Sequence, residues 1–218
     1  MSTLAQIKLA LVERNWVPVA FLRHALKQDL EHWERSQAGP LPHLLKQQIV
    51  RRYAAASGAR VFIETGTYYG FMVQACLGDF DRLFSIEIEP HFYRRAQRLF
   101  KPHSNVTLLH GDSAKLLPAL LATIRCPCLF WLDAHYSGGL TGKADIETPI
   151  GRELETICSH PFQHTVLIDD ANCFDGTHDY PEITRIEKMA RNSGYTMSSS
   201  DNIIRLSRAL SPELRALS

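Results

Sequence analysis

The sequence has no excess of charge of either sign and no long apolar run. Its 24 Lys and Arg residues against 23 Asp and Glu residues leave a formal net charge of +1. No strong field would therefore draw the chain to nucleic acid or to an anionic membrane. No apolar stretch reaches the ~20 residues that a membrane-spanning helix needs. We expect neither nucleic acid nor membrane among the partners.

The sequence predicts neither a disulfide framework nor a signal peptide. The five cysteines are odd in number, and a single residue separates Cys126 from Cys128. A C-x-x-C pair would need two residues between them, so thioredoxin chemistry and a zinc knuckle are disfavoured. Residues 1–6 contain no basic region that leads into an apolar block. We expect reduced thiols and a cytoplasmic location.

Helical patterns fill the first quarter of the chain. Residues 3–35 have apolar side chains at helical spacing, in two pieces, and a further helix is expected over 43–56. We expect residues 1–57 to form an N-terminal helical extension and residues 58–218 to form the main domain. An aromatic stripe in the extension suits core packing, a homodimer contact or a cover for an acceptor site. The stripe consists of Trp16, Phe21, His24 and Trp33.

From residue 60 onward, strand patterns alternate with helix patterns. Strands are expected at 61–63, 83–88, 106–109, 129–132 and 166–168. Helices are expected at 71–77, 90–100, 114–121, 150–158 and 182–192. Two last strands, 195–197 and 203–206, are expected to form a hairpin joined by residues 198–202. The pattern predicts an α/β fold with a Rossmann-like, doubly wound, mostly parallel seven-stranded sheet, a C-terminal antiparallel hairpin and N-terminal helices.

Acidic residues follow two of the apolar strands directly. Asp169 and Asp170 end the run 164–168, and Asp133 ends the run 128–132. Carboxylates at the end of a buried strand are unfavourable unless water, a metal or a ligand compensates them. Ligands collect at the carboxyl ends of the strands in open α/β sheets. The pattern indicates an oxygen-ligand metal site beside a nucleotide pocket, although a helix cap with solvated turn acids is the other interpretation.

The first predicted strand leads into a glycine turn. Gly66 and Gly70 permit a tight turn and close approach of a ligand. The turn contains neither the G-x-G-x-x-G fingerprint nor the Lys of a phosphate-binding loop. Glu64, directly before it, suits a cationic ligand such as the aminoacyl end of S-adenosylmethionine better than a pyrophosphate. This disfavours an NAD-dependent oxidoreductase.

The next two strand ends carry acids as well. Glu87 follows Glu64 by 23 residues, a spacing that places it to bind a ribose diol, with Glu89 as the alternative. Asp112, after the third strand, could accept a hydrogen bond from an adenine amino group. Each acid alone could equally be a helix N-cap or a solvated turn residue.

These motifs resemble those of class I S-adenosylmethionine-dependent methyltransferases, over roughly residues 58–208. The resemblance is greatest to the macrocin O-methyltransferase-like group, and the acids after strands four and five match the layout of metal-dependent catechol O-methyltransferases. It runs through Val61–Gly70, Phe84–Glu87, Leu109–Ser113, Trp131–Asp133 and Leu167–Asp170.

The resemblance implies a set of site residues. It places the methionine moiety near Glu64 and Gly66, the ribose at Glu87 and the adenine at Asp112. The implied cofactor-binding set is Glu64, Gly66, Thr67, Glu87, Asp112, Ser113 and Asp133. The implied ligands of a divalent cation are Asp133, Asp169 and Asp170. Their oxygen donors suit Mg²⁺ best, with Ca²⁺ or Mn²⁺ as alternatives.

Such a site could activate a hydroxyl group for methylation. A sugar hydroxyl is a poor nucleophile near neutral pH, and coordination to a cation lowers its pKa and aligns its oxygen with the methyl donor. His135 is the expected base because an unperturbed histidine titrates near pH ~6.5. Tyr136 and Asp133 are the alternatives. The glycine-rich residues 136–142 could close over the site as a lid.

The function expected from these patterns is S-adenosylmethionine-dependent, metal-assisted O-methylation. The acceptor would be a small molecule or glycan, that is, a hydroxyl of a sugar, a glycan or a natural product. Asn172, Asp175 and His178 are further polar residues that could contact it. A catalytically silent Rossmann-like binding module that partners a biosynthetic enzyme is the alternative.

Overall fold

The computed structural model describes residues 19–36, 39–133 and 148–207. The chain divides into two compact units, Met1–Gln48 and Ile49–Ser218. Helix α2 (Val19–Ser36) lies in the first unit, and α3 (His43–Ser57) runs from the first unit into the second. The division falls inside α3, and the proposed extent of the N-terminal extension stays a prediction.

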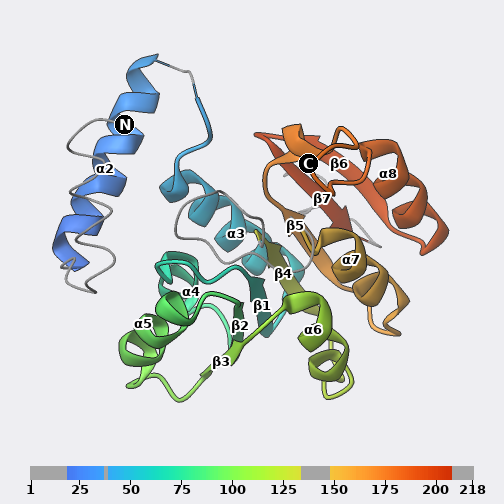
Figure 1. Ribbon diagram of the computed structural model, residues 1–218, viewed down its shortest axis with the longest axis horizontal. Helices are drawn as coiled ribbons and strands as arrows, with labels where there is room; N and C mark the ends of the chain where they lie inside the picture. The colour runs from blue at the N-terminus through green and yellow to red at the C-terminus, as the bar shows by residue number, and fades with distance from the viewer. Residues whose placement is uncertain (1–18, 37–38, 134–147, 208–218) are drawn as a thin grey trace. The chain divides into compact units, whose positions relative to one another are not determined.

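Seven strands form one sheet in the order β3-β2-β1-β4-β5-β7-β6 (Figure 1). Strands β1 to β5 are parallel, and β7 is antiparallel to both β5 and β6. The predicted fold class is confirmed. The strands are β1 Val61–Thr65, β2 Arg82–Glu87, β3 Val106–His110, β4 Cys128–Leu132, β5 Thr165–Ile168, β6 Thr196–Ser200 and β7 Ile203–Ser207.

Helices cover both faces of this sheet. The chain moves outward from β1 to β3 and then returns to β4, so right-handed crossovers place α4 and α5 on one face and α6 and α7 on the other. Helices α6, α7 and α8 follow one another along the right side of Figure 1. Because both faces are covered, β1, β4 and β5 are buried along their whole length. The helices are α4 Phe71–Cys76, α5 Pro90–Phe100, α6 Ser113–Leu121, α7 Ile150–Ser159 and α8 Ile183–Asn192.

Two histidines connect elements at the amino ends of β4 and β5. The amide N of Cys128 donates to Nδ1 of His164 at 3.0 Å, so His164 carries its proton on Nε2. That Nε2 lies 2.8 Å from Nδ1 of His160, which therefore accepts. Nε2 of His160 then donates to the carbonyl oxygen of Leu121 at 3.1 Å. The hydrogen bonds assign one tautomer to each neutral ring.

The hairpin differs from its prediction in the length of its turn. The sequence predicts a link over residues 198–202, but Ser198, Ser199 and Ser200 continue β6. The turn consists of Asp201 and Asn202 alone, at φ 52° and 58°. Two successive residues at positive φ form the turn that matches the twist of paired strands, and Asp and Asn tolerate that conformation.

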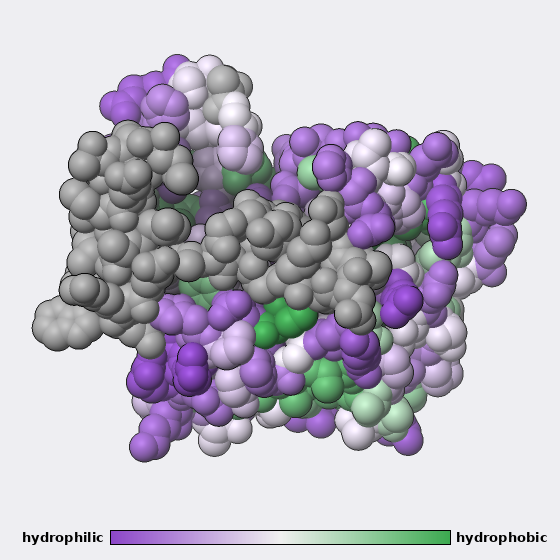
Figure 2. Space-filling model, viewed as in Figure 1, coloured by the Kyte–Doolittle hydropathy of each residue, from purple (hydrophilic) through white to green (hydrophobic). Residues whose placement is uncertain are grey.

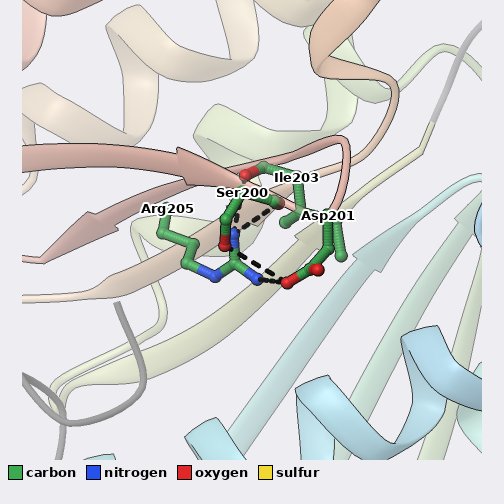
Figure 3. A network of polar contacts seen from close by, with 4 residues as sticks. All are labelled: Ser200, Asp201, Ile203 and Arg205. Atoms are coloured by element: carbon green, nitrogen blue, oxygen red, sulfur yellow. Dashed lines mark hydrogen bonds and ion pairs between the residues drawn. The ribbon is translucent and has the colours of Figure 1, made fainter.

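A buried arginine holds this turn in place (Figure 3). Arg205 is 5% exposed, and its Nη1 donates to the carbonyl oxygens of Ser200 at 2.6 Å and Ile203 at 2.9 Å. Its Nη2 lies 3.0 Å from Oδ2 of Asp201. The guanidinium carbon also lies 6.0 Å from the ring centre of Tyr53 on α3. One side chain thus links the turn, both strands of the hairpin and a helix.

The described surface is mostly hydrophilic in the view of Figure 2. Among the described residues, Tyr68 is the large apolar side chain that is exposed, at 50%. Within the same part of the chain, no helix is both long and apolar enough to cross a membrane.

Replacing Arg205 by Met keeps much of the apolar stem and removes every donor. We expect the free energy of unfolding to fall by about 2–3 kcal/mol, because buried carbonyl groups lose their charged partner. Urea unfolding measures this change. Asp201→Asn is the control and should lower the free energy of unfolding by less than about 1 kcal/mol, since Asp201 is half exposed. Equal losses in the two variants would contradict the role given to Arg205.

Candidate cofactor and acceptor site

The parallel register brings the predicted acids to one edge of the sheet. Glu64 in β1 lies beside Ser85 in β2, and Glu87 at the end of β2 lies beside His110 in β3. The amide N of Asp133 donates to the carbonyl oxygen of Thr65 at 3.0 Å, which continues the ladder beyond β4. This edge is where ligands bind in sheets of this kind.

Glu64 is a fully buried carboxyl group with a hydroxyl donor. It is 1% exposed, and Oγ of Ser85 donates to its Oε2 at 2.6 Å. Oγ1 of Thr67 lies 2.6 Å from the same Ser85 oxygen and must donate to it, since the Ser85 proton is already used. Burial raises the pKa of Glu64 well above its usual range, the Ser85 hydrogen bond opposes this, and the charges of Asp133 and Glu87 add to it.

Glu87 ties the glycine turn to the end of β2. Its Oε2 accepts from the amide N of Tyr68 at 2.8 Å, and its Oε1 accepts from the amide N of Glu89 at 2.8 Å. Burial raises the pKa of Glu87, and these two hydrogen bonds oppose the shift. Glu89 is instead the N-cap of α5, where its side chain accepts from the amide N of His91. The structure thus distinguishes the two candidate acids of β2.

The turn between β1 and α4 needs unusual backbone angles. Gly66, Tyr68 and Gly70 have φ values of 85°, 49° and 79°. A Cβ atom at Gly70 would lie 2.8 Å from the Phe100 ring, so only glycine fits there. Tyr68 is not glycine, and its conformation costs about 1–2 kcal/mol. The hydrogen bond from its amide N to Glu87 offsets part of that cost.

Asp112 and Ser113 lie where β3 passes into α6. Oδ1 of Asp112 accepts from the amide N of Ala114 at 2.9 Å, which makes Asp112 the N-cap of α6. Its Oδ2 lies 3.4 Å from Nζ of Lys115. Ser113 is buried at the start of the helix. The capping role is therefore present whether or not Asp112 also contacts a ligand.

The three aspartates predicted to bind a metal all act electrostatically on one tyrosine, Tyr180. The pKa of Tyr180 is raised by burial first and then by the charges of Cys173, Asp170, Asp133 and Asp169. Among the described residues, no group of three or more His, Cys, Asp and Glu side chains could hold a metal ion. The metal site stays a prediction.

Hydrogen bonds already engage the pair of acids that follows β5. Oδ1 of Asp169 accepts from the amide N of Asp170 at 2.9 Å. Asp170 has φ 54°, and its Oδ1 accepts from Nδ2 of Asn202 in the hairpin turn at 3.3 Å. The hairpin thereby fixes one wall of the site.

The other predicted site residues are either exposed or outside the described part of the chain. His135 and the residues 136–142 are outside the described residues. Asn172, Asp175 and His178 are exposed. Oδ1 of Asp175 accepts from the amide N and the hydroxyl of Thr177, the pattern of an ordinary polar turn. A contact between these loop residues and an acceptor stays a prediction.

Three residues near this edge were not predicted from the sequence. Ser85 is a small polar residue inside the apolar strand β2, and Glu153 is an acid on the apolar face of α7. Both exceptions to the apolar pattern could have marked them. Tyr180 follows a polar loop, and no local pattern places it beside the aspartates.

Several solved structures with a similar fold are methyltransferases. The O-methyltransferase TomG from Streptomyces achromogenes, involved in tomaymycin synthesis and solved with S-adenosylmethionine, has a TM-score of 0.55 and 19% identity, covering 84% of this chain and 88% of its own. The N-methyltransferase NodS from Bradyrhizobium japonicum WM9 has a TM-score of 0.51 and 16% identity, covering 76% and 93%. A candidate caffeoyl-CoA O-methyltransferase from Staphylococcus aureus has a TM-score of 0.53 and 11% identity, covering 94% and 100%.

The chain has a Rossmann-like methyltransferase fold. At these identities the likeness establishes the fold, and O-methyltransferases are among the proteins that share it. No protein-family model and no curated protein matches the chain. The activity is therefore inferred from the residues of the site.

Replacing Ser85 by Ala removes the donor to Glu64 and the acceptor of Thr67 together. We expect the free energy of unfolding to fall by about 1–3 kcal/mol, because buried polar groups lose their partners. Urea unfolding followed by circular dichroism measures the loss. Ser199→Ala, at an exposed position of β6, is the matched control, with an expected change of less than about 0.5 kcal/mol. No difference between the two variants would contradict the hydrogen-bond chain.

Proposed function

We propose that the protein transfers a methyl group from S-adenosylmethionine to a hydroxyl group of a sugar, glycan or natural product. The observation that carries the proposal is the pair of buried carboxyl groups at the ends of β1 and β2, Glu64 and Glu87, on either side of a glycine turn. The methyltransferase fold supports the same activity. The likeness to the macrocin O-methyltransferase-like group remains part of this proposal.

Each acid suits a different part of the cofactor. A carboxylate has about four lone-pair positions, and backbone donors occupy two of those on Glu87. The amide of Ile88 also acts on this carboxyl group, which leaves at least one position to accept a hydroxyl of a ribose. Within the described part of the chain, no cation is among the groups that shift the pKa of Glu64. An ammonium group of the cofactor beside Glu64 would supply the missing positive charge and favour the ionised carboxylate.

The acceptor would bind near Tyr180, on which the charges of Asp133, Asp169 and Asp170 act. The raised pKa of Tyr180 keeps its hydroxyl protonated, so it can donate a hydrogen bond to an acceptor oxygen. His135 is the proposed base. A divalent cation, which the oxygen donors of the aspartates suit, would lower the pKa of the acceptor hydroxyl when bound.

Calorimetric titration with S-adenosylhomocysteine tests the cofactor assignment. We expect micromolar binding by the wild type and binding about 10- to 100-fold weaker by Glu87→Ala, which loses hydrogen bonds to a charged acceptor. Glu187→Ala, which removes an exposed acid of α8, is the control and should bind as the wild type does. No binding by the wild type would overturn the proposal and leave the silent binding module.

The binding of Mn²⁺, followed by electron paramagnetic resonance, tests the cation. We expect one bound ion, with affinity lowered at least about tenfold in Asp169→Asn and in Asp133→Asn, because each change removes a charged ligand. Asp175→Asn, in the exposed loop, should leave the affinity unchanged. Absence of binding at millimolar Mn²⁺ would remove the cation from the proposal without affecting the cofactor.

A further inference from the structure

Glu153 is a buried acid that the proposed reaction does not use. It lies on α7 among the buried side chains Ile150, Leu154 and Ile157, and it is 1% exposed. Neither of its oxygens has a hydrogen-bond partner of good geometry among the described residues. A buried carboxyl group without such a partner is rare in folded proteins and calls for an explanation.

Two hydroxyl groups are the polar neighbours of this carboxyl group. Ser113 at the start of α6 and Thr65 at the end of β1 both interact with Glu153, and Oγ1 of Thr65 is itself buried without a well-formed hydrogen bond among the described residues. A neutral carboxyl group can donate to one hydroxyl and accept from the other, whereas a carboxylate can only accept.

The charges around Glu153 favour its neutral form. Burial raises the pKa of Glu153 to about 7, the hydroxyls of Ser113 and Thr65 oppose the shift, and the charge of Asp112 adds to it. Among the described residues, Asp112 is the charged group whose effect on Glu153 is resolved, and its Oδ2 lies 3.4 Å from Nζ of Lys115. Among the described residues, no positively charged group contributes to this shift of the pKa.

The two hydroxyls belong to the segments that would hold the cofactor. Thr65 precedes Gly66 in the turn assigned to the methionine moiety, and its carbonyl oxygen accepts from Asp133. Ser113 follows Asp112, which is assigned to the adenine. Glu153 therefore lies between the two ends of the proposed cofactor site, on the α6–α7 face of the sheet.

We propose that Glu153 is a positioning residue whose neutral carboxyl group joins Thr65 to Ser113 and so holds the turns after β1 and β3 in the shape that binds the cofactor. This inference rests on the proposed function. Loss of the proton would place an uncompensated charge between the two turns, and relief of that charge would require them to move apart or to admit water.

The sign of the pH effect follows from the direction of the shift. The folded protein keeps the proton of Glu153 at pH values where the unfolded chain has lost it. The stabilising contribution is complete at pH 4 and is lost as the pH rises through about 7. Cofactor affinity should decline over the upper part of the same range.

Glu153→Gln separates shape from protonation, because the amide can both donate and accept but does not titrate here. We expect the affinity for S-adenosylhomocysteine, measured by calorimetry, to fall between pH 6 and pH 8 about tenfold more in the wild type than in Glu153→Gln. Glu64 and Glu87 titrate in both proteins. The test is therefore the difference between the wild type and Glu153→Gln in how their affinity changes with pH. Glu155→Gln, an exposed change on the same helix, is the matched control and should behave as the wild type does.

A second variant tests the partner. Thr65→Val keeps the shape of the side chain and removes a hydroxyl that lowers the pKa of Glu153, so the decline in affinity should move to higher pH. The same pH dependence in Glu153→Gln and the wild type, or an unmoved decline in Thr65→Val, would overturn the inference while the proposed function stands. Failure of the wild type to bind S-adenosylhomocysteine at any pH would overturn both.

Discussion

Burial of two carboxyl groups at the carboxyl edge of a parallel sheet is the constraint on which the rest of the site depends. Transfer of an acid from water into a protein interior is unfavourable unless hydrogen bonds or charges replace the lost water. Glu64 obtains a hydroxyl donor from the neighbouring strand, and Glu87 obtains two amide donors from the adjacent turns. The register of the sheet supplies the first donor, and the shape of the glycine turn supplies one of the others.

The same constraint explains why the turn after β1 contains strain. The amide N of Tyr68 reaches Glu87 with the tyrosine at positive φ, and the Phe100 ring leaves room only for glycine at residue 70. Local backbone strain tolerated in this way is typical of ligand-binding segments. Glu87, at the end of β2, therefore helps to shape the turn after β1.

Local sequence patterns predicted the strands and helices of residues 61–207 well, apart from the hairpin turn, because buried parallel strands and amphipathic helices leave apolar periodicities within short windows. The hairpin turn was predicted too long, since three serines carry no strand pattern and pair only because β7 provides a partner. The contacts of Glu64 and Glu153 could not be predicted. They depend on which side chains the sheet register and helix packing bring together, and neighbouring residues in sequence do not encode that information.

The hydrogen bonds through the pair of histidines at the opposite edge of the sheet run in one fixed direction, from donor to acceptor. An amide N–H begins the chain at Cys128 and can only donate, and a carbonyl ends it at Leu121 and can only accept. The direction of the hydrogen bonds through the two imidazoles therefore cannot be reversed. A proton cannot pass from one ring to the other without breaking the hydrogen bond at one end. His160 and His164, the residue type most often associated with proton transfer, thus form a fixed hydrogen-bonded connection between β4, β5 and α6.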